Sequence, residues 1–205
     1  MDRYILLSVL FTAAAARFNQ EQIPIQAIAD VQGGAPGAAA TIAGETISTL
    51  LGAADPCDKL AQADKIVSEL GGGADAVAAA IGLVAAEQNF NNFNADFPNI
   101  CADATLPATQ ELRGITPLVD PALDGAEIAN ALSAQTKAAP INAVGKSIAD
   151  LLVEAGFTSF NGADAAGGAT GGAAAGGAAV GDAAANATND NVAADNNCDD
   201  EENSR

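Results

Sequence analysis

Apolar residues recur roughly every three to four positions along several stretches between residues 41 and 160, which is the spacing of an amphipathic helix. The first such stretch covers residues 41–52. The second has stronger boundary signals, because Asp55 can cap its free N–H groups, Pro56 suits its first turn, and glycines at 71–73 end it. The pattern therefore predicts two successive helices in this part of the chain.

A third helix is predicted from Ala74 onward, with an apolar stripe that consists of alanines at first and reaches Phe97. Pro98 ends any helix at that point. Asparagine is a poor helix former, so the four asparagines in residues 89–94 favour an earlier end, near Asn89.

The second half of the domain is predicted to hold a short helix and two longer ones, at residues 108–113, 127–137 and 144–155. Ile128, Ala131 and Leu132 are expected to face inward from the middle one. Gly156 is the expected C-terminal cap of the last, and the phenylalanines within 157–160 can fold back over that end. Together these elements predict an all-α fold, a small bundle of about five helices with Pro-rich connections.

The segments that flank this helical domain (residues 41–160) have a different composition. Residues 17–40 form a mixed lead-in whose isoleucines can dock as an extended strand or a short turn. From residue 161 onward the chain alternates Gly with Ala and then becomes rich in Asn and Asp, so 161–205 is predicted to be a disordered, acidic tail. Asn186 opens an Asn-Ala-Thr sequence there, which is either an N-glycosylation site or a chance triplet in an Asn-rich stretch.

Residues 1–16 have the pattern of a secretory signal peptide. Arg3 supplies a positive charge, residues 4–11 are apolar, and the alanines of 13–16 offer a processing site with cleavage after Ala16. The apolar run is too short for a membrane-spanning helix, which needs about twenty residues. The alternative is a buried N-terminal helix. We therefore expect a secreted protein without a transmembrane anchor.

The net charge of −18 and the absence of histidine exclude several classes of function. Nucleic-acid binding requires Lys and Arg to replace counterions, and anionic membranes repel so acidic a chain. Catalysis by Ser-His-Asp or Cys-His groups and zinc sites with histidine ligands are also excluded. None of the candidate catalytic carboxylates stands in a recognisable motif. These candidates are Asp55, Asp58, Asp64, Glu69, Asp75, Glu87 and Asp96. We expect no enzyme activity, no cofactor and no metal site.

Three cysteines, Cys57, Cys101 and Cys198, are present. In an oxidising compartment, Cys57 and Cys101 are the natural pair, and their bond would tie the start of one predicted helix to the end of the next. Cys198 lies in the acidic tail, where it is free, bonds to a second chain, or replaces one of the other two.

Phe90, Phe93 and Phe97 form a cluster interleaved with asparagines. If it is exposed, the cluster makes an apolar patch suited to a hydrophobic surface or a lipid. If it is buried, it belongs to the core, and the scarcity of aromatic residues (4% of the chain) favours burial.

The combination of a signal peptide, an Ala-rich helical domain, a cysteine pair and a low-complexity tail resembles small secreted cell-surface proteins of filamentous fungi. The similarity covers residues 20–160 and rests on the sequences at 55–60, 85–91, 105–109 and 111–114. It implies a location in the cell wall or outside the cell, and it carries over no catalytic residues.

The sequence therefore predicts a non-enzymatic, secreted protein of the cell surface or cell wall, with a structural, adhesive or surface-binding role. Its expected partner is a cell-wall polymer, a hydrophobic surface or an extracellular protein. The alternative is a soluble extracellular carrier or effector that binds an apolar ligand or a host partner through the Phe90–Phe97 face. The oligomeric state stays open.

Overall fold

The computed structural model describes residues 20–163 and 169–170. This part of the chain holds six α-helices, one short 3-10 helix and a small sheet, so the all-α prediction is confirmed apart from the sheet. The predicted signal peptide, Asn186 and Cys198 lie outside the described residues.

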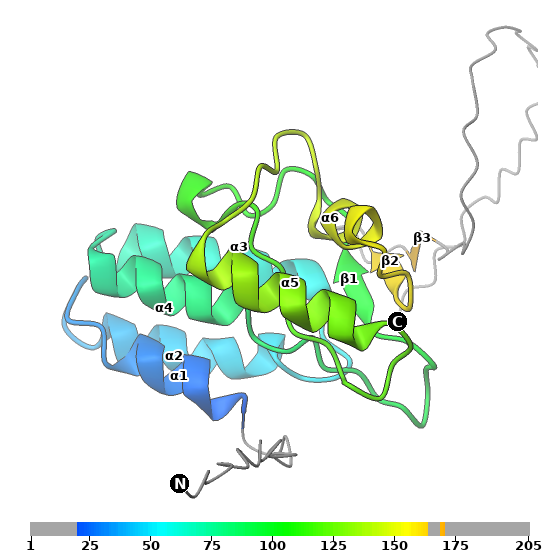
Figure 1. Cartoon of the computed structure of the whole chain (residues 1–205). Helices are drawn as coiled ribbons and strands as arrows, with labels where there is room; N and C mark the ends of the chain where they lie inside the picture. The colour runs from blue at the N-terminus through cyan, green and yellow to red at the C-terminus, as the bar shows by residue number, and fades with distance from the viewer. Residues whose placement is uncertain (1–19, 164–168, 171–205) are drawn as a thin grey trace, which may run out of the picture. The chain divides into compact units, whose positions relative to one another are not determined.

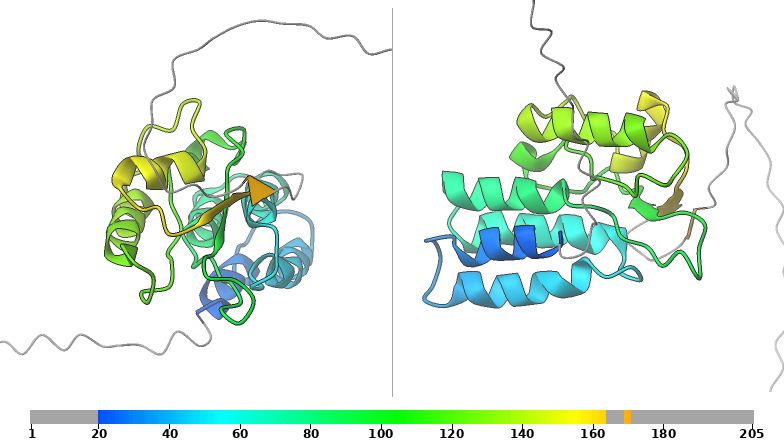
Figure 2. Two further views of the ribbon diagram at one scale, coloured as in Figure 1. Left: turned by 90° about the vertical axis from the view of Figure 1, so that its right-hand side faces the viewer. Right: turned by 60° about the horizontal axis from the view of Figure 1, so that its bottom comes forward.

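The first four helices form a closed ring in which each packs against the next and the fourth packs against the first. They are α1 (Gln22–Ala29), α2 (Ala38–Thr49), α3 (Pro56–Glu69) and α4 (Ala74–Val84). Figure 1 and the right-hand view of Figure 2 show α1 and α2 in one layer and α3 and α4 in the next. The side chains that fill this ring are fully buried and aliphatic, among them Ile28, Ile42, Ile66 and Leu83. Burial of these side chains stabilises the ring.

A further pair of helices, α5 (Ala126–Ala138) and α6 (Ile148–Ala155), lies on the other side of α3 and α4 (Figure 2). The short 3-10 helix η1 (Gln110–Leu112) contacts α4 and confirms the prediction of a short helix there. Gly156 caps α6 with a φ of 98°, as expected, and the chain then turns back so that Phe157 stacks on Phe160 at a centroid distance of 5.8 Å. Both rings are buried in the core.

A small sheet joins distant parts of the chain. Strand β1 (Asn99–Cys101) pairs in parallel with β2 (Asn161–Ala163), and β2 pairs antiparallel with β3 (Ala169–Thr170). The sequence predicted none of these three strands, and it predicted that the folded domain ends at residue 160. The boundary was wrong, because the backbone of residues 161–163 bonds to β1.

The lead-in at residues 17–40 contains a helix, α1, and not the extended strand or turn that we expected. Pro24 is tolerated because it lies in the first helical turn, where its missing N–H has no helical partner. Ile28 and Val31 are buried, whereas Ile23 is 68% exposed. Residues 20–40 of the lead-in therefore belong to the folded domain.

Helix α4 ends at Val84, well before the predicted limits at Asn89 or Phe97. The backbone leaves the helix because Gln88 N–H donates to Leu118 O (2.8 Å), which ties this segment to a distant one. The spacing of three to four residues between Phe90, Phe93 and Phe97 is thus not a helical stripe.

The buried face of α5 also differs from the prediction. Ala131 is exposed, Ile128 is 37% exposed and Leu132 is only partly buried. The buried residues are small ones, namely Ala126, Ala129, Ser133 and Thr136. The Thr136 hydroxyl accepts a hydrogen bond from Thr116 N–H (3.0 Å), and this contact requires a close approach that larger side chains would prevent.

None of the helices in the described part of the chain is both long enough and apolar enough to cross a membrane.

Candidate functional site

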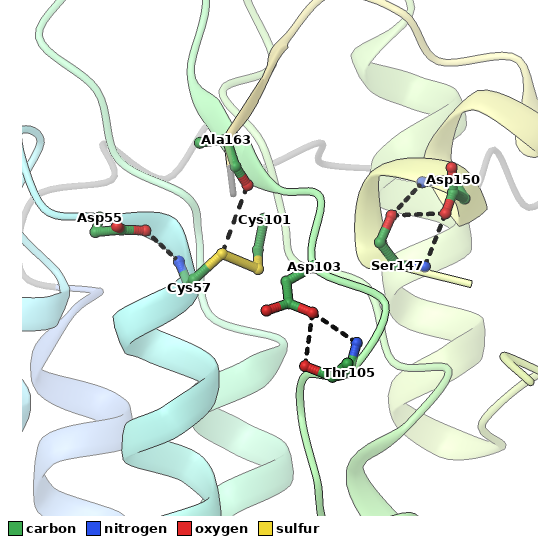
Figure 3. The surroundings of a disulfide bond; sticks show 8 residues. All are labelled: Asp55, Cys57, Cys101, Asp103, Thr105, Ser147, Asp150 and Ala163. Atoms are coloured by element: carbon green, nitrogen blue, oxygen red, sulfur yellow. Dashed lines mark hydrogen bonds between the residues drawn. A yellow bond between two sulfur atoms is a disulfide. The ribbon is translucent and has the colours of Figure 1, made fainter. Parts of the chain in front are cut away.

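The predicted disulfide between Cys57 and Cys101 is present, with an S–S distance of 2.09 Å (Figure 3). Cys57 lies in the first turn of α3, where its N–H donates to the capping carboxylate of Asp55 (2.8 Å). Cys101 ends β1, so the bond joins the helical ring to the small sheet. The Ala163 carbonyl oxygen of β2 lies 3.5 Å from Cys57 Sγ. This is a polar contact and not a hydrogen bond, because a disulfide sulfur carries no proton.

The segment that follows the disulfide is held by polar contacts of its own. Asp103 accepts hydrogen bonds from the side chain and the N–H of Thr105 (2.6 and 2.7 Å), and these bonds lower the pKa of the Asp103 carboxyl (Figure 3). Arg113 donates to the carbonyl oxygens of Pro107 (2.9 Å) and Ala104 (2.5 Å). These hydrogen bonds hold residues 103–113 in a fixed conformation next to the disulfide.

The Phe cluster lies on a loop, residues 85–98, which we call the Phe loop. Phe93 is 93% exposed, Phe97 is 41% exposed and Phe90 is partly buried. The expectation that the cluster belongs to the core was wrong for Phe93 and Phe97. The side-chain oxygen of Asn91 accepts a hydrogen bond from Phe93 N–H (3.0 Å). This bond takes the place of the backbone hydrogen bond that Phe93 N–H would make in a helix, so the chain forms a turn here.

The Phe loop is held against the connection between α2 and α3. Asn89 Nδ2 donates to Leu50 O (2.8 Å). A Cβ atom on Gly52 would lie 3.0 Å from the backbone carbon of Phe90, so the two segments touch closely. These contacts bring Leu51, which is 58% exposed, next to the loop that carries Phe93. Leu51 and Phe93 are therefore two exposed apolar side chains on neighbouring segments.

A cleft with a volume of about 90 Å³ opens beside the base of the Phe loop. Its apolar lining comes from Ile23, Pro24, Leu50, Ala85 and Leu118. The charged residues Glu21, Glu87 and Lys137 also line it. The sequence analysis missed this cleft, because five segments far apart in the chain build it, at residues 20–24, 50, 82–89, 118 and 137.

Lys59 of α3 is the most unusual charged residue in the described part of the chain. Its side chain is 2% exposed, and Nζ donates to Ala86 O (2.9 Å). Burial lowers the pKa of Lys59 to about 7, against a smaller opposing effect of the Glu87 carboxylate. No pattern in the sequence predicts the burial of Lys59, because it stands next to Leu60 in an ordinary amphipathic pattern.

Some of the carboxylates considered for catalysis accept hydrogen bonds from backbone N–H groups. Asp64 accepts hydrogen bonds from the N–H groups of Ala108 (2.7 Å) and Thr109 (2.8 Å). Asp75 accepts from Gln32 N–H and Ala76 N–H, and these two bonds lower the pKa of its carboxyl. Within residues 20–163 and 169–170, no group of three or more acidic, Cys or His residues is placed to hold a metal ion.

Comparison of the chain with models of known protein families, with curated proteins and with solved structures finds no match.

Proposed function

We propose that this is a non-enzymatic extracellular protein that binds an apolar surface at the cell boundary through the Phe loop. The observation that carries the proposal is the 93% exposure of Phe93 on a loop that is fixed at its base. Phe93, Phe97 and the nearby Leu51 all expose apolar surface in this region, and exposed apolar surface that is gathered in one region marks interaction sites.

The composition of the Phe loop favours an apolar partner. Between Gln88 and Pro98 the only charged residue is Asp96, and the other polar residues are four asparagines. Little charge therefore has to lose its water when this loop meets an apolar surface. The net charge of −18 in turn keeps the rest of the molecule hydrated and keeps copies of the protein apart in solution.

The contribution of Phe93 to binding can be estimated from its size. Complete burial of one Phe side chain contributes about 1.5–3 kcal/mol, which corresponds to roughly a 10-fold to 100-fold change in affinity. Burial of the Leu51 side chain on the neighbouring segment would add to this binding free energy, by less than Phe93 because Leu51 is already partly covered.

The test compares the adsorption of Phe93→Ser with that of the wild-type protein on alkyl-coated beads and on uncoated beads. Val144→Ser is the matched control, because Val144 is 81% exposed and lies on a different connection. We expect Phe93→Ser to lose roughly tenfold or more in affinity for the coated beads, and Val144→Ser to bind like the wild type. Unchanged adsorption of Phe93→Ser would refute the proposed role of the loop.

Melting curves of the same variants separate binding from folding. Because Phe93 is exposed, its substitution leaves the melting temperature close to that of the wild type. If adsorption is unchanged but binding to a soluble extracellular ligand is lost, the carrier or effector role through the same face takes precedence.

Extracellular location is the second half of the proposal, and it rests on the sequence of residues 1–16 and on the resemblance to fungal surface proteins. Fractionation of expressing cells tests it. Mature protein in a detergent-washed wall fraction supports association with the wall, whereas free protein in the medium favours the diffusible role. Retention inside the cell with residues 1–16 uncleaved would refute secretion.

A further inference from the structure

Lys59 connects helix α3 to the start of the Phe loop. Its Nζ donates a hydrogen bond to Ala86 O (2.9 Å), and Ala86 directly follows Ala85, the residue that caps the end of α4. Among the residues that the structure describes, no other acceptor bonds to Nζ. The void beside Lys59 has a volume of about 10 Å³, which is room for about one water molecule. This buried site can therefore satisfy only part of the three N–H donors of an ammonium group.

The charged groups on the elements around Lys59 do not make up for the missing acceptors. Glu87, at the start of the Phe loop, is the carboxylate that acts on Lys59, and its attraction is weaker than the effect of burial. On α2, Glu45 pairs with Lys65 (2.6 Å), and on α4, Asp75 accepts hydrogen bonds from two backbone N–H groups. Strand β1 has no charged residue, and apart from Lys59 the void is lined by uncharged residues. The other carboxylates of α3 and α6, with the cap of α3, are exposed or bond to other groups, namely Asp55, Asp58, Asp64, Glu69, Asp150 and Glu154.

The base of the Phe loop, residues 85–89, borders empty space. Four of its five residues line the cleft of about 90 Å³ described above. A segment beside a cavity can shift with less displacement of its neighbours than a segment inside a close-packed core. Two further hydrogen bonds hold this base, from Gln88 N–H to Leu118 O (2.8 Å) and from Leu118 N–H to Ala85 O (3.2 Å). The amides of Gln88 and Leu118 therefore report whether the base has moved.

Proton binding to Lys59 and movement of the loop base are coupled. While Nζ is buried, the pKa of Lys59 is about 7, because burial disfavours the charged form. Where Nζ reaches water, its pKa returns to 10.5. An open arrangement thus binds the proton more tightly than the closed one, and each drop of one pH unit between these values raises the ratio of open to closed molecules up to about tenfold. Below about pH 7 both arrangements are protonated, so the ratio becomes constant.

We propose that Lys59 controls the attachment of the Phe loop by gaining or losing one proton. The neutral amine holds Ala86 against α3. Proton uptake favours an open arrangement in which residues 85–89 move into the cleft and Nζ reaches water, while Phe93 stays exposed at the tip. The inference goes beyond the proposed function, because it concerns the conformation of the loop and not what the loop binds.

Native-state amide hydrogen exchange of the full chain tests this coupling. The readout is the protection of the Gln88 and Leu118 amides, that is, their exchange rate corrected for its intrinsic dependence on pH. In the wild type we expect this protection to fall roughly tenfold or more from about pH 8.5 to about pH 7, because proton uptake favours opening. Lys59→Met should lose this dependence, and Lys59→Gln takes its place if Lys59→Met does not fold. Lys65→Met, the matched control on the same helix, should keep the dependence.

Urea separates local opening from complete unfolding, which also exposes Lys59. Local opening exposes little surface, so low concentrations of urea leave the protection of the Gln88 and Leu118 amides unchanged. Protection that depends on pH through Lys59 and is insensitive to urea supports the inference, whether or not Phe93→Ser loses adsorption. Protection that is constant with pH, that keeps its pH dependence in the Lys59 variant, or that falls with urea as in complete unfolding overturns it.

Discussion

The buried amino group of Lys59 leads to a prediction about how stability depends on pH. The pKa of Lys59 is about 7 in the folded protein and 10.5 in an unfolded chain. Between these values the unfolded state binds a proton that the folded state does not. Unfolding therefore takes up a proton, and the free energy of unfolding rises with pH across this window.

The size of the effect follows from the shift. Each pH unit inside the window contributes up to about 1.4 kcal/mol, and the whole shift corresponds to about 5 kcal/mol. Below about pH 7 the contribution of Lys59 is constant, because both states are then protonated. This change of unfolding free energy with pH is large for a single residue, and no histidine titrates near pH 7 to obscure it.

Lys59→Met removes the titrating group and keeps most of the side-chain volume. It also leaves Ala86 O without the hydrogen bond from Nζ, which costs about 1–3 kcal/mol. We therefore expect the variant to be more stable than the wild type by about 2–4 kcal/mol near pH 7. The two proteins should converge, and the order reverse, as the pH approaches about 10.

Urea unfolding followed by far-UV circular dichroism at several values between about pH 7 and about pH 9.5 measures this difference. Lys65→Met is the matched control, because Lys65 lies on the same helix but its side chain is 35% exposed. The control should keep the slope of the wild type. A wild-type protein whose stability is flat across this range, or a Lys59→Met variant with the same slope, would refute the assignment of a neutral buried lysine.

Three further substitutions test the packing of the domain by urea unfolding. Replacing Cys57 and Cys101 together by Ser should lower the free energy of unfolding by about 4 kcal/mol, because the bond closes a loop with a sequence separation of 44; an equally stable variant would contradict a structural role. Ser147→Ala removes the hydroxyl of the capping box at the start of α6 and should cost about 1 kcal/mol; unchanged stability would contradict a role of this hydroxyl in the cap. Gly114→Ala should destabilise strongly, since Gly114 has a φ of +80° and a Cβ atom there would lie 1.9 Å from Ile141 O; a neutral effect would mean that the backbone at this turn can move.

The sequence predicted best those elements whose boundaries have strong local signals. Helix α3 begins where Asp55 and Pro56 indicated, and α6 ends at Gly156. The pairing of Cys57 with Cys101 was expected because both lie in the helical domain and Cys198 lies in the tail, and the bond is confirmed. In each case the deciding interaction lies within a few residues or is covalent.

The elements that were predicted wrongly depend on distant contacts. Helix α4 stops at Val84 because the next segment bonds to Leu118, which no local pattern reveals. The parallel pairing of β1 with β2 joins residues about sixty positions apart, and three-residue strands carry almost no alternating pattern. The buried face of α5 consists of Ala, Ser and Thr, so the largest apolar side chains indicated the wrong side.

At the candidate site, too, the features with a local signal could be predicted and those that depend on distant contacts could not. The Phe cluster was visible as a sequence feature, but only the fold places Phe93 in solvent. The cleft and the buried ammonium of Lys59 could not be predicted, because each is defined by segments that come together only in three dimensions.

The ring of α1 to α4 has a consequence for how the protein is made. The ring ends at Val84 and already holds Cys57, so it can form from local contacts while the rest of the chain is still being synthesised. Cys101 is the next thiol to emerge, and Cys198 follows 97 residues later (198 − 101), a delay of roughly 5–20 s at typical elongation rates. In an oxidising compartment, the order of synthesis therefore gives Cys57 its native partner before the competing thiol exists.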